Sequence, residues 1–342
     1  MVPSPFDDGC IAVESSDRLV TDGGTGDAPE TEGAFVLDDS EMGERGGERY
    51  RILVPILDSD ADEREEHDVE RLLRAAAALA RTRDGEVHLV NVVLFPEQTP
   101  LSHVAEESQV ESARDDVTRL LDRTAEEGVE RVSGGSVCLA HSETRALLHL
   151  LDERGYDAAF LGTRDTSSQR RRLFRGDTVE RLLADAACDV YVERFGVEPY
   201  VEELGSATDR MERLLLAVAD SPHSDLAGEM ARALALDTPA RIDVVHCVPT
   251  DATEPAIEAA IGLVEGVARD LRDVAETGTT IVRTESAPEE VIHRSNNYDL
   301  TLLGAPREGL LQQFIYGSLP ERVRLGSKNT VLMARRAPRR AR

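Results

Sequence analysis

Short runs of apolar residues alternate with amphipathic segments from about residue 50 to the end of the chain. Several runs are apolar at nearly every position, which is typical of strands buried on both faces of a parallel sheet. The segments between them repeat apolar residues at helical spacing. Strands that alternate with helices predict a parallel sheet with right-handed connections. The strands are predicted at residues 52–57, 87–94, 137–140, 158–161 and 190–193, and again at 214–219, 242–248, 280–283, 300–303 and 331–334.

The same order of elements occurs twice, so the chain is predicted to hold two domains, as its length also indicates. The first domain spans residues 49–197 and the second spans 211–337, with 198–210 as the linker. Residues 1–48 are rich in Gly, Asp, Glu, Ser and Thr without periodicity, which predicts a disordered acidic leader. A short basic tail, 338–342, ends the chain.

One motif recurs at the fourth strand of each half and at the helix that follows it. The residues are 156–162 (YDAAFLG) with Gly176-Asp177, and 298–304 (YDLTLLG) with Gly317-Ser318. A glycine before a helix is typical of a phosphate site, because unpaired N–H groups and the positive end of the helix dipole face the anion. A carboxylate about 4 Å from a phosphate costs on the order of 4 kcal/mol at an effective dielectric near 20. We therefore expect Asp177 to disfavour phosphate in the first half, and Ser318 to permit it in the second.

The net charge of the chain limits the kinds of molecule that it is expected to bind. The chain has 66 acidic and 39 basic residues, a formal net charge of −27, and Lys328 is its one lysine. This composition is similar to that of cytosolic proteins from salt-loving organisms, where molar salt shortens the Debye length to about 3 Å. A charge of this sign argues against a nucleic-acid partner, which needs a basic face.

Cysteine and histidine spacing predicts no metal centre. Cys10, Cys138, Cys188 and Cys247 form no CxxC pair, so reduced structural thiols are expected. No apolar stretch reaches the length of a membrane span, and the N-terminus lacks the pattern of a signal peptide. A cytoplasmic location is predicted.

The motif, together with an aspartate at the end of each first strand, resembles the universal stress protein family over residues 49–337. Many members bind ATP through Gly-x2-Gly-x9-Gly-Ser/Thr after strand four, and others lack this pattern and do not bind ATP. The resemblance implies an α/β fold of two tandem Rossmann-like (adenine nucleotide alpha hydrolase-like) domains. Each would be a five-stranded parallel sheet in order 3-2-1-4-5 with helices on both faces. It implies a non-enzymatic stress-response or regulatory protein of haloarchaeal type, with no catalytic residues.

In the second half the resemblance implies a site for ATP or AMP, with no metal beyond nucleotide-bound Mg. Its residues would be Asp220, Ser221, Gly304, Arg307, Gly309, Gly317 and Ser318. Gly317 and Ser318 have the family's spacing from Gly304, whereas Arg307 stands where the middle glycine belongs. Asp220 would accept a hydrogen bond from adenine or a ribose hydroxyl. The alternative, that Asp220 is a turn residue and Ser318 a helix cap, stays open.

The first half departs further from the pattern. Asp58 and Gly162 match it, but Asp165 stands at the middle glycine and Gly176 comes one residue late, before Asp177. The arginines at 170–172 and 175 would either pair with the acidic surface or reverse the repulsion. We expect this half not to bind ATP in the family's manner.

Two other functions stay open. Residues 309–317 resemble the loop of stress-protein domains fused to haloarchaeal amino-acid permeases, which implies a stand-alone partner of a membrane transporter, a permease or an antiporter. A weak ATPase would need a metal-binding carboxylate or a catalytic lysine near the phosphates. The one lysine, Lys328, lies just before the last strand, some distance in sequence from the loop, which argues against this function.

The family's closing strands pair across a two-fold axis. Two halves in one chain can satisfy this pairing internally, and unpaired edges are a liability. Residues 331–334 are therefore predicted to pair antiparallel with 190–193 as an internal pseudo-dimer. A further homodimer stays open.

Overall fold

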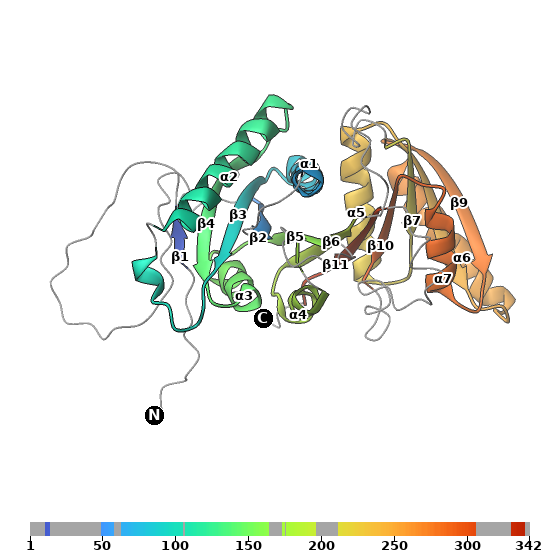
Figure 1. Cartoon of the computed structure of the whole chain (residues 1–342). Helices are drawn as coiled ribbons and strands as arrows, with labels where there is room; N and C mark the ends of the chain where they lie inside the picture. The colour runs from blue at the N-terminus through green and yellow to red at the C-terminus, as the bar shows by residue number, and fades with distance from the viewer. Residues whose placement is uncertain are drawn as a thin grey trace.

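Within the described residues, eleven strands form one continuous sheet in the order β1-β4-β3-β2-β5-β6-β11-β10-β7-β8-β9 (Figure 1). The computed structural model describes residues 11–13, 49–57, 63–104, 107–163, 173–174, 176–195, 211–305 and 330–338. The two halves therefore share one sheet rather than forming two separate ones.

The first half confirms the predicted strand order 3-2-1-4-5, as β4-β3-β2-β5-β6, with parallel pairing throughout. Its strands are β2 (Arg51–Leu57), β3 (Glu86–Leu94), β4 (Val132–Ala140), β5 (Ala158–Thr163) and β6 (Asp189–Arg194). Its helices are α1 (Glu63–Thr82), a 3-10 turn η1 (Leu101–His103), α2 (Ser108–Glu126), α3 (Glu143–Glu153) and α4 (Gly176–Asp185).

The second half repeats this order as β9-β8-β7-β10-β11. Its strands are β7 (Arg213–Ala217), β8 (Arg241–Val248), β9 (Glu276–Arg283), β10 (Leu300–Gly304) and β11 (Thr330–Arg335). Its described helices are α5 (Pro222–Asp237), α6 (Glu254–Leu271) and α7 (Ala287–Ser295). The helix predicted after Gly317-Ser318 lies outside the described residues.

Two layers of helix cover the sheet. The apolar stripes of α1, α2, α5 and α6 pack on one face, and those of α3 and α4 pack on the other. This two-sided burial explains the continuous apolar runs, since β5 is buried at all six of its positions. No described helix is long and apolar enough to cross a bilayer.

The halves join through β6 and β11, which pair antiparallel from Val190↔Arg335 to Arg194↔Val331. The predicted internal pairing of the closing strands is confirmed. Arg335 fastens the junction, because its buried guanidinium donates to the carbonyls of Ala186 (2.7 Å) and Cys188 (3.2 Å) beyond the end of α4. On one face α1 and α5 lie side by side across the junction (Figure 1).

The repeated Tyr-Asp pair proves to be structural. Asp157 accepts from Arg51 N (2.9 Å), and Asp299 accepts from Arg213 N (2.8 Å), so each aspartate holds the start of its half's first strand. In each half the arginine lies 4.8 Å over the adjacent tyrosine ring. These contacts lie at the amino ends of the strands, opposite the edge at which α/β sheets bind ligands.

The leader was expected to be mostly disordered, and one short strand is described within it. Residues Ile11–Val13 form β1, which pairs antiparallel with Val137–Leu139 of β4. The expectation of four reduced thiols is wrong, because Cys138 is disulfide-bonded, whereas Cys188 and Cys247 are free. Three apolar residues in a polar segment are too short a pattern to predict a strand.

Candidate functional site

The carboxyl edge of the second half places Asp220 and Ser221 just beyond β7. β7 pairs with β8 on one side and β10 on the other, so this is the point where the strand order reverses and ligands bind in open α/β sheets. Asp220 is exposed, and its carboxylate makes no hydrogen bond or ion pair with another described residue. It is therefore available to a ligand.

The side chain of Ser221 makes a structural hydrogen bond within the protein. It is the N-cap of α5, and its Oγ accepts from Ser224 N at 3.2 Å. Ser224 in turn accepts from Ala219 N at 2.9 Å through its own hydroxyl. These bonds fix the turn that presents Asp220, so Ser221 positions the site through the backbone.

Gly304 ends β10 directly against the first turn of α5. A Cβ at this position would lie 2.5 Å from Ser224 N and 2.6 Å from His223 C. Glycine is required here because backbone approaches backbone. The structure thus brings Asp220, Ser221 and Gly304 to one edge, whereas Arg307, Gly309, Gly317 and Ser318 lie outside the described residues.

Sequence reasoning missed His246 on β8. Its Nδ1 lies 2.7 Å from the carbonyl oxygen of Val218, so Nδ1 carries the proton and donates. Since Val218 follows β7, the ring links β8 to the turn that carries Asp220. Asn91 holds the corresponding place on β3, where it is fully buried and donates to Ala113 O at 3.4 Å. A polar residue at this position of both second strands was the available clue.

The corresponding site in the first half, at the carboxyl end of β5, is filled by side chains of the protein itself. Phe174 N donates to Gly162 O at 3.0 Å, and Leu173 and Phe174 are both buried against the end of β5. Glu143, at the start of α3, accepts a hydrogen bond from the Thr178 hydroxyl in the first turn of α4. With the exposed Asp177, two carboxylates therefore lie at this helix N-terminus. Asp58 and Asp165 lie outside the described residues.

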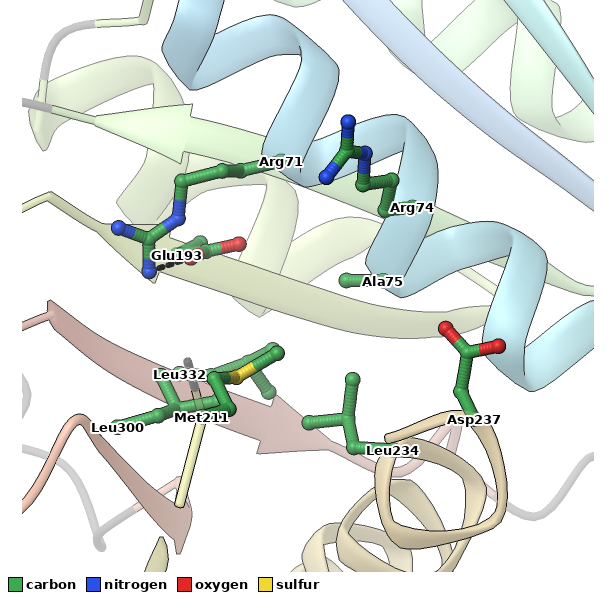
Figure 2. A pocket seen from close by; sticks show the side chains of 9 residues that line it. All are labelled: Arg71, Arg74, Ala75, Glu193, Met211, Leu234, Asp237, Leu300 and Leu332. Atoms are coloured by element: carbon green, nitrogen blue, oxygen red, sulfur yellow. Dashed lines mark hydrogen bonds and ion pairs between the residues drawn. The ribbon is translucent and has the colours of Figure 1, made fainter. Parts of the chain in front are cut away.

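A separate cavity lies between the halves (Figure 2). Its volume is about 10 Å³, which is room for one water molecule. Arg71 of α1 reaches Glu193 of β6 (Nη2–Oε1 3.3 Å), above an apolar floor from the second half. The remaining lining residues are Arg74, Ala75, Met211, Leu234, Asp237, Leu300 and Leu332.

Glu193 is a buried charge at this junction. Its side chain is 4 % exposed, and burial raises its pKa to about 7, opposed by Arg71 and reinforced by Asp68. Its Oε2 has no hydrogen-bond partner within the described part of the chain. The cavity is too small for a nucleotide, and it is a junction feature rather than a second ligand site.

One buried Ser–His contact exists in the first half. His88 Nε2 lies 3.0 Å from Ser136 Oγ, and both residues are less than 10 % exposed. Burial lowers the pKa of His88 to about 4, with Arg51 and Arg154 adding to the effect. The pair lies inside the fold near the start of β3, out of reach of a substrate. Within the described ranges, no group of three His, Cys, Asp or Glu side chains is placed to hold a metal.

Comparison with known proteins agrees with this architecture. The model of the family described as "Universal stress protein family" matches residues 49–194 and 211–335. The cytoplasmic domain of a prokaryotic cation chloride cotransporter has a similar fold, with TM-score 0.50 and 14 % identity, covering 84 % of this chain and 96 % of that one. A universal stress protein from Archaeoglobus fulgidus DSM 4304 covers the same shares at 15 % identity and TM-score 0.46.

A third solved structure, a universal stress protein in complex with cAMP, matches at 14 % identity and TM-score 0.27, covering 42 % of this chain and 95 % of that one. No curated protein matches the chain.

Proposed function

Because this chain belongs to the universal stress protein family, with one family domain in each half, we propose that it is a non-enzymatic regulatory protein whose second half binds an adenine nucleotide. The observation that carries the proposal is the exposed carboxylate of Asp220, which has no polar partner among the described residues, at the point where the strand order reverses. We assign the adenine or ribose to Asp220 and the phosphates to Gly317 and Ser318, with Arg307 and Gly309 beside them.

The inequality of the halves supports the same proposal. In the first half, the carboxylates of Glu143 and Asp177 lie at the helix N-terminus where phosphates would bind. At about 4 Å, the repulsion between a carboxylate and a phosphate costs on the order of 4 kcal/mol. The attraction of a phosphate to a helix N-terminus contributes only about 0.3–1 kcal/mol, so the repulsion is the larger effect. We therefore assign one nucleotide to each chain, with any Mg²⁺ held by the nucleotide.

Isothermal titration of the full-length protein with ATP and with AMP tests this. We expect one site per chain. Ser318→Asp, which copies Asp177, should weaken binding at least about a hundredfold through phosphate repulsion. Asp220→Ala should weaken it about tenfold or more, since a hydrogen bond to a charged group contributes about 1.5–3 kcal/mol.

Asp177→Ser is the matched control, and we expect it to leave both affinity and stoichiometry unchanged. Absence of heat with the wild-type protein would refute nucleotide binding. Two sites per chain would refute the assignment of the first half as closed.

A second candidate is a partner of a membrane transporter. It is favoured by the likeness to the cotransporter's cytoplasmic domain, which covers both halves of this chain. Affinity capture from a detergent-solubilised membrane fraction should then recover a transporter, and recovery that is unchanged by Ser318→Asp would separate this role from nucleotide binding.

A further inference from the structure

Among the strands that the structure describes, the outer edge of β9 is the open rim of the sheet. At the other rim β1 pairs with β4, and at the junction β6 pairs with β11. β9 pairs with β8 alone among the strands that the structure describes (Figure 1). Its eight residues therefore present a row of unpaired backbone donors and acceptors.

The central residues of β9, between Glu276 and Arg283, lack the usual protection of an open edge. Natural edges carry lysine, proline or inward-pointing charges that prevent pairing. Residues 277–282 are Thr-Gly-Thr-Thr-Ile-Val, with no charge and no proline, in a chain whose residues are 31 % charged. Threonine, isoleucine and valine favour strands, so this edge is suited to pairing.

The flank of α6 beside this edge is exposed, and its acidic and basic residues are separated along the helix. Six exposed residues lie along it at helical spacing: Glu254, Glu258, Ile261, Glu265, Arg269 and Arg272. Leu263 and Val267, on the other flank, pack on the core, so the exposed flank faces outward past β9. Its amino-terminal part is acidic and its carboxyl-terminal end is basic.

We propose that two copies of this chain pair antiparallel through β9, which brings the two α6 helices side by side across a two-fold axis. Strands in a sheet lie about 4.8 Å apart. Since α6 packs on both β8 and β9, it lies near the line between them, about 5 Å from the axis. The two helices would then be about 10 Å apart, which matches the 8–10 Å of packed helices.

Charge is complementary in this arrangement. Antiparallel helices place Glu254 and Glu258 of one copy opposite Arg272 and Arg269 of the other. The two β9 strands can pair about a two-fold axis at Thr279, where residues 277–281 of the two copies face one another, or at Thr280, where residues 278–282 do. All of these residues are uncharged, and in neither register do residues of like charge face each other. If the two α6 helices were parallel, side chains of like charge would face each other, which disfavours that arrangement.

Sedimentation of the full-length protein from about 1 to 100 µM, at an ionic strength near 0.15 M, tests the dimer. We expect a monomer–dimer equilibrium in the wild type. Glu254→Arg/Glu258→Arg should weaken it at least about tenfold, because arginines then face Arg269 and Arg272 of the partner. These side chains are exposed, so the fold should be retained.

The net charge provides an internal control. Glu254→Arg/Glu258→Arg makes the chain less negative, which by general repulsion alone would strengthen association. Adding Arg269→Glu/Arg272→Glu restores both the net charge and the complementarity, and the dimer should return to within about threefold of wild type. Thr280→Lys should weaken it independently through the strands.

A wild-type protein that is monomeric throughout, or a dimer that the helix and strand variants leave unchanged, would overturn the proposal. Failure of the charge-swapped protein to recover would also overturn the antiparallel arrangement of α6.

Discussion

Replacing Gly304 with alanine is expected to lower the free energy of unfolding by about 3 kcal/mol or more. The added Cβ would lie 2.5 Å from Ser224 N, 2.6 Å from His223 C and 2.9 Å from His223 O. Overpacking usually costs about 1–3 kcal/mol when side chains can move. Here the obstacles are backbone atoms in a turn fixed by the Ser221 cap, so the cost should reach or exceed that range. Chemical denaturation measures it.

Gly228→Ala is the matched control on α5. A Cβ there would meet nothing within 4 Å, so this change should stabilise the protein by roughly 0.5–1 kcal/mol. If Gly304→Ala abolished nucleotide binding while leaving stability unchanged, Gly304 would be a ligand contact rather than a packing requirement.

Replacing Glu193 with glutamine is expected to make the protein more stable at pH 8 by up to about 3 kcal/mol. Burial raises the pKa of Glu193 from 4.5 to about 7, and each unit corresponds to about 1.4 kcal/mol. The folded state therefore binds this proton more tightly than the unfolded state, and the wild type loses stability as pH rises from about 4.5 to about 7. Glutamine abolishes that loss and keeps an oxygen for Arg71.

The measurement is the difference in unfolding free energy between Glu193→Gln and wild type from pH 4.5 to 8. It should grow with pH and level off above about 7. The charged groups around the carboxyl are Asp68, Arg71 and Arg74 of α1 and Asp237 of α5. The control is Glu212→Gln, at an exposed position, whose unfolding free energy should change with pH in the same way as that of the wild type. A difference independent of pH would show that Glu193 does not titrate in this window.

Much of the fold was predictable because buried parallel strands have a simple pattern. The apolar runs located all ten strands of the two halves. The pairing of β6 with β11 was predictable because two halves in one chain leave two closing strands to satisfy each other. Strand ends were less accurate, since β9 starts four residues earlier than predicted, in the polar stretch from Glu276.

The junction could not be predicted from pattern. Glu193 was predicted only as the last residue of a strand, and its burial depends on α1 and β11 closing over it. The position of Glu143 in the first-half site similarly depends on the contact of α3 with α4, because its partner Thr178 is 35 positions away in sequence. At the candidate site, the family resemblance indicated Asp220 after the first strand and Gly304 at the end of the fourth, and both lie there. The packing of Gly304 against α5 could not be predicted, because it required the position of α5.

The central junction also sets an order of events during synthesis. Val190 pairs with Arg335, which emerges from the ribosome 145 residues later (335 − 190). At about 5–20 residues per second, the edge of β6 waits roughly 7–30 s for its partner. Glu193 then stands in water as a charged residue on an open edge, a feature that discourages pairing between nascent chains. The Glu193 carboxylate therefore destabilises the folded protein at high pH but protects the incomplete nascent chain from pairing with other chains.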